Sequence, residues 1–181
     1  MNQKTAMKLF GLLGLLMLLS CGYADRHRNS SSCEQALVDS LEVRVQDSLF
    51  SNVHYSRSQL LEALTQTQDS LVYYRLLALY GKTFFVSSDF DSILYYNRRV
   101  KEFSRNASQS SESLQSPRWN DVLSDVYNIE GNVWMQLNRP DSAIIDYKKA
   151  YGYRLEGKKL HLLPDICINI ADAYLHRSDL A

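Results

Sequence analysis

The chain contains 181 residues, of which 45% are hydrophobic, and it carries 20 basic and 20 acidic side chains. Loss of a leader containing Lys4 and Lys8 would leave 18 basic residues against 20 acidic ones, which argues against a dedicated nucleic-acid-binding or anionic-membrane surface. The length suits one domain with a sizeable core, and the presence of 7 glycines and 3 prolines favours an all-helical chain.

Residues 1–20 have the composition of an export signal. They lack acidic residues, carry two lysines near the start and continue as an apolar run from Leu9 to Leu19. A helix needs about 20 apolar residues to cross a bilayer, so this run is too short to span one. A basic start followed by a short apolar run is typical of a secretory signal peptide.

The end of this run resembles the lipobox of bacterial lipoproteins, because residues 18–21 read Leu-Leu-Ser-Cys. The resemblance implies that Cys21 is lipidated and becomes the first mature residue. Cleavage after Ala24, which would give a secreted or inner-membrane-tethered protein, is the alternative. Residues 21–33 are polar and rich in serine and arginine, which predicts a flexible tether between membrane and domain.

Residues 34–70 are predicted to form N-terminal helices that make up a divergent repeat. The stretch 34–50 has an amphipathic pattern with period four. Its apolar stripe is Leu37, Leu41, Val45 and Leu49. A second helix is expected over residues 58–67, with Ser58 as its N-cap.

Residues 71–104 are predicted to form a pair of helices. The first covers residues 71–86, and either Asp69 or Ser70 can cap it. A turn follows at residues 87–89, and the second helix runs to about residue 103.

A serine-rich stretch at residues 105–117 is predicted to be a solvated loop that separates this pair from the next helices. Helices are then expected at residues 118–137, 141–155 and 160–176. The turn between the first two contains Pro140, whose fixed φ suits the start of a helix, and Asp141 or Ser142 can cap that helix.

The clearest internal signal is a repeat with an offset of 50 positions between residues 77–100 and 127–150. In each copy a small residue precedes a bulky one by three positions, and spaced apolar residues follow after a turn. The corresponding positions are Gly81 and Gly131, Phe84 and Trp134, Ile93 and Ala143, Asn97 and Tyr147, and Val100 and Ala150. This pattern predicts helix hairpins that bury their apolar faces by stacking on their neighbours.

The second copy resembles the tetratricopeptide repeat (TPR) family at Tyr127, Gly131, Trp134, Ala143, Tyr147 and Ala150. Gly131 and Ala143 would let the two helices approach, while Trp134 and Tyr147 would fill the space beside that contact. The resemblance implies an all-α fold of antiparallel helix hairpins stacked as a right-handed solenoid. Repeats are expected at 71–104 and 118–157, with periods longer than the family's about 34 residues.

A third, incomplete repeat is expected at residues 160–181. Ala171 and Tyr174 correspond in it to Gly131 and Trp134. The second helix of this hairpin is absent from the sequence, so we expect a C-terminally truncated chain whose remainder carries further structure.

In the TPR family the first helices of the repeats form a groove that holds peptides. The positions that match its groove-facing places are Arg75, Lys82, Asp125, Asn128, Asn132, Asp165, Asn169 and Asp172. Asparagine suits a peptide backbone because its amide both donates and accepts hydrogen bonds. The alternative is that these side chains are simply exposed helix residues.

No pattern for catalysis, metal binding or cofactor binding is found. The triplet Gly81-Lys82-Thr83 ends like a phosphate-binding loop, but Leu76 stands where that motif needs a glycine and the triplet lies inside a predicted helix. The four histidines are scattered without the spacing of metal ligands. We therefore expect no enzyme, no cofactor and no nucleic-acid partner.

These features together predict a non-enzymatic scaffold that is anchored by lipid on Cys21 in the bacterial cell envelope and faces the periplasm. It would bind an unidentified protein or peptide partner in its groove. The alternative function is the periplasmic sensory region of a membrane-tethered signalling or transcriptional regulator, whose transmembrane and effector domains would lie beyond residue 181.

Overall fold

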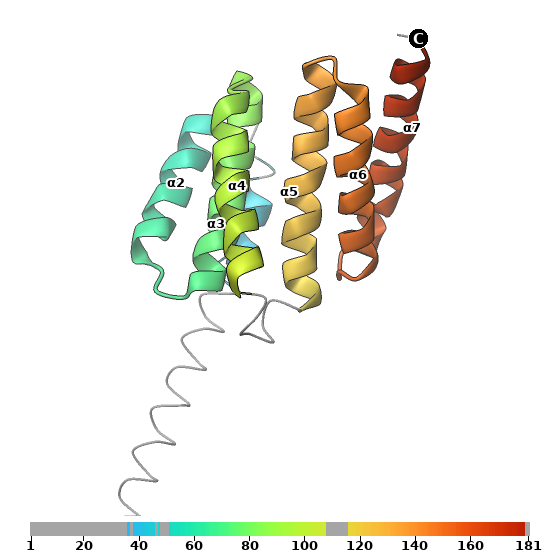
Figure 1. Cartoon of the computed structure of the whole chain (residues 1–181). Coiled ribbons are helices and arrows are strands. Elements are labelled where there is room, and N and C mark those ends of the chain that lie inside the picture. Colours follow the sequence, from blue (N-terminus) through green and yellow to red (C-terminus); the bar gives the residue numbers. More distant parts are fainter. Residues whose placement is uncertain (1–35, 37, 46, 48–50, 108–115, 180–181) are drawn as a thin grey trace, which may run out of the picture. The chain divides into compact units, whose positions relative to one another are not determined.

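The computed structural model describes residues 36, 38–45, 47, 51–107 and 116–179, and every regular element among them is a helix (Figure 1). This confirms the all-α class for the described residues. The predicted signal peptide, the tether and Cys21 lie outside them. The chain divides into two units, residues 1–40 and 41–181, and the helices labelled α2 to α7 all belong to the second.

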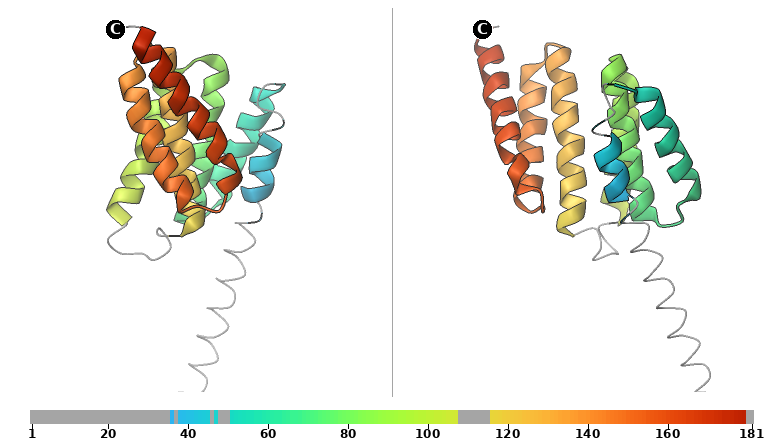
Figure 2. Two further views of the ribbon diagram at one scale, coloured as in Figure 1. Left: turned by 90° about the vertical axis from the view of Figure 1, so that its right-hand side faces the viewer. Right: turned by 180° about the vertical axis from the view of Figure 1, so that it is seen from behind.

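The second unit is a row of helices in which each one packs on the next along the chain (Figures 1 and 2). In addition, α3 contacts α5, and α5 contacts α7. The elements are α2 (Val53–Gln66), α3 (Ser70–Lys82), η1 (Thr83–Ser87), α4 (Phe90–Ala107), α5 (Pro117–Gln136), α6 (Pro140–Leu155), η3 (Leu160–Leu162) and α7 (Leu163–Asp179).

The start of α2 differs from the prediction. The helix begins at Val53, and its N-cap is Asn52, whose Oδ1 accepts a hydrogen bond from the Tyr55 backbone N–H at 3.1 Å. Ser58 lies inside the helix, where its hydroxyl donates to the Tyr55 carbonyl at 2.8 Å. The prediction that Ser58 caps this helix was therefore wrong, because asparagine at residue 52 supplies the acceptor earlier.

The hairpin of α3 and α4 agrees more closely with the prediction. Asp69 is confirmed as the cap of α3, since its Oδ1 accepts a hydrogen bond from the Leu71 N–H at 2.8 Å. The α-helix ends at Lys82 and continues as the 3₁₀ turn η1, which closes at Ser88 in the left-handed conformation. Asp89 then caps α4 by accepting from the Ser92 N–H at 3.1 Å.

Proline occupies the first position of both α5 and α6. Ser116 caps α5 by accepting from the Trp119 N–H at 3.3 Å. The N-cap of α6 is Arg139, and no side chain there accepts a capping hydrogen bond, so the prediction that Asp141 or Ser142 caps this helix was wrong. Pro140 accounts for the start of α6 instead, because it fixes φ and has no N–H to satisfy.

The contact between α5 and α6 depends on Gly131. A Cβ built on this residue would lie 2.3 Å from Cε1 of Tyr147, far inside van der Waals contact. Ala143 and Ala150 of α6 are fully buried, and Ser124 of α5 donates a hydrogen bond to the Ala150 carbonyl at 2.8 Å. The small residues of the repeat therefore lie where the two helices approach most closely.

The hairpin of α3 and α4 has a similar contact in a looser form. A Cβ on Gly81 would lie 2.9 Å from Cβ of Tyr96, and the ring of Phe84 stacks on the Tyr96 ring with centroids 5.6 Å apart. Asn97, which corresponds in sequence to Tyr147, is fully buried and donates a hydrogen bond to the Val126 carbonyl of α5 at 3.2 Å.

Helix α7 packs on α6 through the side that carries Ala173, Ile170 and Tyr174. Ala173 is fully buried against α6 and Tyr174 packs partly buried beside it, whereas Ala171 is exposed. Its counterpart Gly131 faces the second helix of its own hairpin, and the side of α7 that carries Ala171 also carries Ile168 and Leu175, which are 65% and 64% exposed.

Replacing Gly131 with alanine should destabilise the chain by about 1–3 kcal/mol, because the new methyl group would overfill the space taken by the Tyr147 ring. Chemical denaturation followed by circular dichroism measures this change. Gly152 of α6 is the matched control, since a Cβ there meets no atom within 4 Å. Alanine at this exposed helical site should stabilise by up to about 1 kcal/mol, so shifts of equal sign would contradict the packing.

Candidate functional site

Helix α5 carries a polar stripe along one side. Asp121, Asp125, Asn128 and Asn132 are spaced by four, three and four residues, which places them on one helical face. Trp134, two positions after Asn132, lies on the other side of the helix. The stripe brings together three positions that the sequence predicted for partner binding.

Helix α7 contributes a second polar stripe next to the first, formed by Asp165, Asn169 and Asp172 at spacings of four and three. The two stripes meet directly, because Asn169 Nδ2 donates a hydrogen bond to Asn128 Oδ1 at 3.0 Å. Asp165 and Asp172 are exposed, while the two asparagines are half-buried. The predicted residues on α5 and α7 therefore form one continuous surface.

Tyr147 reaches this surface from α6. Its hydroxyl donates a hydrogen bond to Asn132 Oδ1 at 2.7 Å. Burial, with the Asp172 carboxylate as a second cause, raises the pKa of the Tyr147 phenol, so the hydroxyl remains protonated and able to donate. Because this hydrogen bond uses Oδ1 of Asn132, it fixes the orientation of the amide and leaves the NH₂ group available to donate to other acceptors.

One end of the α5 stripe is held by a buried ionic network. The guanidinium of Arg154, whose side chain is 2% exposed, donates from Nη1 to Asp121 Oδ1 at 2.8 Å and from Nη2 to Asp125. Asp121 also accepts the backbone N–H groups of Lys158 and Lys159 at 3.0 and 3.1 Å. This carboxylate therefore ties α5 to the end of α6 and to the loop that leads into α7.

The loop approaches Asp121 closely enough to require glycine. A Cβ on Gly157 would lie 2.2 Å from Asp121 Oδ1. Asn120 adds a long hydrogen bond to the Glu156 carbonyl at 3.4 Å. These contacts give Asp121 a structural role that the sequence did not reveal, although its position four residues before Asp125 extends the predicted stripe.

Arg75 and Lys82 come from α3 rather than from α5 or α7. Arg75 is 7% exposed, and its Nη2 lies 3.8 Å from Glu42 Oε2. Lys82 is half-buried in the last turn of α3. The structure thus joins the predicted residues of α5 and α7 and places Arg75 in a separate contact with Glu42, which the sequence did not indicate.

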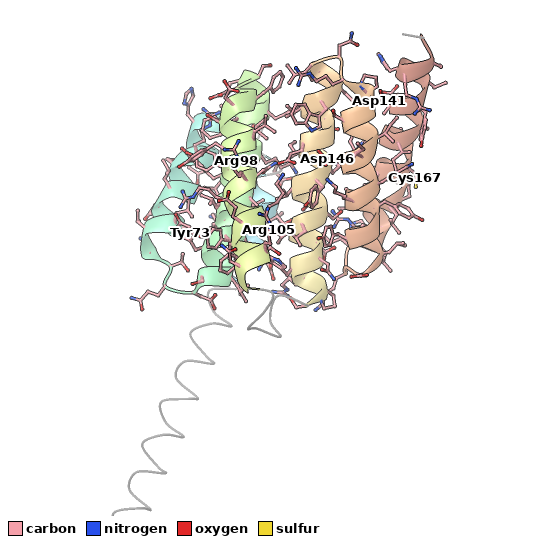
Figure 3. The ribbon with its side chains drawn as sticks, viewed as in Figure 1. Tyr73, Arg98, Arg105, Asp141, Asp146 and Cys167 are labelled. Atoms are coloured by element: carbon pink, nitrogen blue, oxygen red, sulfur yellow. The ribbon has the colours of Figure 1, made fainter. Side chains whose placement is uncertain are left out.

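The other side of α5 has its own charged cluster. Lys101 Nζ lies 2.6 Å from Glu130 Oε2, and burial raises the pKa of the Glu130 carboxyl while Lys101 opposes that rise. Asp146 of α6, which is labelled in Figure 3, accepts a hydrogen bond from Trp134 Nε1 at 2.8 Å. Both carboxylates are paired with donors on neighbouring helices, which indicates that they stabilise packing.

Among the described residues, no group of three or more His, Cys, Asp or Glu side chains is placed to hold a metal ion. None of the described helices combines the length and apolar character needed to cross a membrane. Comparison with protein-family models, curated proteins and solved structures gives no match.

Replacing Asp121 with alanine should destabilise the chain by about 3–5 kcal/mol, because it leaves the buried Arg154 guanidinium without its best-buried partner and two loop amides without an acceptor. Urea unfolding of the purified chain tests this. Glu102, an exposed carboxylate of α4, is the control, and its alanine variant should stay within about 0.5 kcal/mol. Similar midpoints for the two variants would rule out the proposed role of the network.

Proposed function

We propose that the chain is a non-enzymatic, TPR-like interaction scaffold that is anchored in the bacterial cell envelope and binds a protein or peptide partner. The observation that carries this proposal is the continuous surface formed by Asn128, Asn132, Asn169 and Asp172. Its amide groups can pair with a peptide backbone, and its exposed carboxylate favours a basic or donor group on the partner.

The assignment to the TPR-like class is supported by the repeated hairpin contact. Gly131 lies under the Tyr147 ring, and Gly81 lies against Tyr96 one hairpin earlier. The contacts of α3 with α5 and of α5 with α7 support a common face made by the first helices of successive repeats. A right-handed solenoid whose inner face binds the partner is part of the proposal.

The proposed anchor is a lipid on Cys21. The proposed location is a membrane of the bacterial cell envelope, with the chain facing the periplasm. The support comes from the apolar leader and the Leu-Leu-Ser-Cys sequence at residues 18–21. A sensory region of a membrane-tethered regulator is the second candidate. A later run of about 20 apolar residues in the complete reading frame would favour that candidate.

A photoreactive amino acid placed at Asp172 should form a covalent adduct with a defined partner protein in living cells, because this side chain is exposed on the proposed binding surface. Mass spectrometry of the adduct would identify that protein. Ile145, which is 56% exposed on α6, is the control position and should give no such adduct. The same adducts from both positions, or none from Asp172, would refute partner binding at this surface.

Replacing Cys21 with alanine should abolish incorporation of a fatty-acid analogue and release the chain from the membrane fraction. The reason is that the lipid would be attached through this thiol. Metabolic labelling followed by fractionation measures both effects. Replacement of Cys33 supplies the matched control and should leave labelling intact. Absence of label from the unsubstituted chain would favour cleavage after Ala24, and label that survives the loss of the Cys21 thiol would contradict attachment through Cys21.

A further inference from the structure

Glu42 connects two basic residues that are far apart in the sequence. Its Oε2 lies 3.8 Å from Arg75 Nη2 of α3, and its Oε1 pairs with Nζ of Lys159 in the loop after α6. Glu42 is 16% exposed and Lys159 is 33% exposed, so the contact is accessible at its edge. One carboxylate thus bridges the two cations.

The residues around Glu42 form a short amphipathic helical segment. Residues 41–45 are helical, and Leu41 and Val45 are each 3% exposed. Their spacing of four places them on one face, whereas Val43, between them, is 59% exposed. The segment therefore turns two aliphatic side chains inward, and the Glu42 carboxylate beside them contacts Arg75 and Lys159.

This segment covers a residue that the sequence predicted for partner binding. Arg75 belongs to α3, the first helix of the first hairpin, and it is 7% exposed with Glu42 in place. The position that a bound peptide would take beside Arg75 is therefore taken by the chain itself. The occupant also shows which chemistry fits there: one acid and two aliphatic side chains on a helix.

The polar part of this contact is weak enough to exchange. The ion pair to Arg75 is long at 3.8 Å, and the pair to Lys159 is partly exposed on the lysine side, where water and salt screen it. A covalently attached segment has a high effective concentration, which compensates for modest intrinsic affinity. A separate helix with the same pattern and better contacts would therefore compete with it.

We propose that the surface between Arg75 and Lys159 binds an amphipathic helical peptide that presents a carboxylate beside two aliphatic residues four positions apart. Residues 41–45 occupy this surface and must be displaced by the partner. This inference rests on the proposed binding function and specifies the chemistry of the partner for the part of the surface around Arg75. Residues 41–45 would regulate binding there by competing with the partner.

A fluorescent peptide of residues 34–50 provides the probe, and fluorescence anisotropy with the purified full-length chain provides the measurement. The Glu42→Lys chain should bind this peptide at least about tenfold more tightly than the unsubstituted chain, because like charges would drive its own segment from Arg75 and Lys159. A peptide that carries Glu42→Gln should bind that chain about tenfold more weakly.

Two adjacent lysines supply the matched control. A chain that carries both Glu42→Lys and Lys159→Glu should bind the peptide about tenfold more weakly than the chain with Glu42→Lys alone, because the peptide carboxylate loses its lysine partner. Lys158→Glu makes the same charge change at an exposed neighbour and should leave binding within about twofold. Equal effects of the two changes, or equal binding by the Glu42→Lys and unsubstituted chains, would overturn the proposal.

Hydrogen exchange gives a second measurement that does not depend on a folded charge variant. Excess peptide added to the unsubstituted chain should speed amide exchange at residues 41–45 as the segment is released. Unchanged exchange at a peptide concentration that shows saturated binding would overturn displacement. If these tests fail while crosslinking at Asp172 still traps a partner, the scaffold function stands and only the helical acidic ligand is rejected.

Discussion

The contact of Gly131 with the Tyr147 ring determines how closely α5 and α6 approach, and much of the remaining structure depends on it. Because the glycine has no Cβ, the aromatic ring lies directly on the α5 backbone. The same ring brings its hydroxyl to Asn132, 2.7 Å away. One residue thus completes the core of the hairpin and orients an amide on the proposed binding surface.

The hairpin of α5 and α6 also positions the loop before α7. Arg154 and Asp121 join the end of α6 to α5, and Asp121 binds the backbone of that loop. Since both charges are buried, loss of either partner is costly, which makes the loop geometry well defined. The loop in turn carries Lys159 to Glu42 and directs α7 so that Asn169 meets Asn128.

The proposed binding surface has two different chemistries. Amides and carboxylates predominate where α5 meets α7, whereas Arg75 and Lys159 make the region around Glu42 basic. A partner that used both regions would be bound in one direction, since charge complementarity fixes register as well as affinity. The segment around Glu42 already satisfies the basic region, so regulation and recognition would use the same contact.

The order of amino acids was enough to predict the helical class, the positions of the main helices and the small residues at the hairpin contact. Periodicity and glycine placement report on local geometry and on the nearest helix neighbour, and short stretches of chain encode both. The packing of the helices was needed to show that Asp121 pairs with Arg154, that Glu42 bridges Arg75 and Lys159, and that Ala173 rather than Ala171 is buried on α7. Such pairings join residues about 30 to more than 100 positions apart, as between Asp121 and Arg154 or Glu42 and Lys159. They depend on how the helices are oriented in space, which no local pattern encodes.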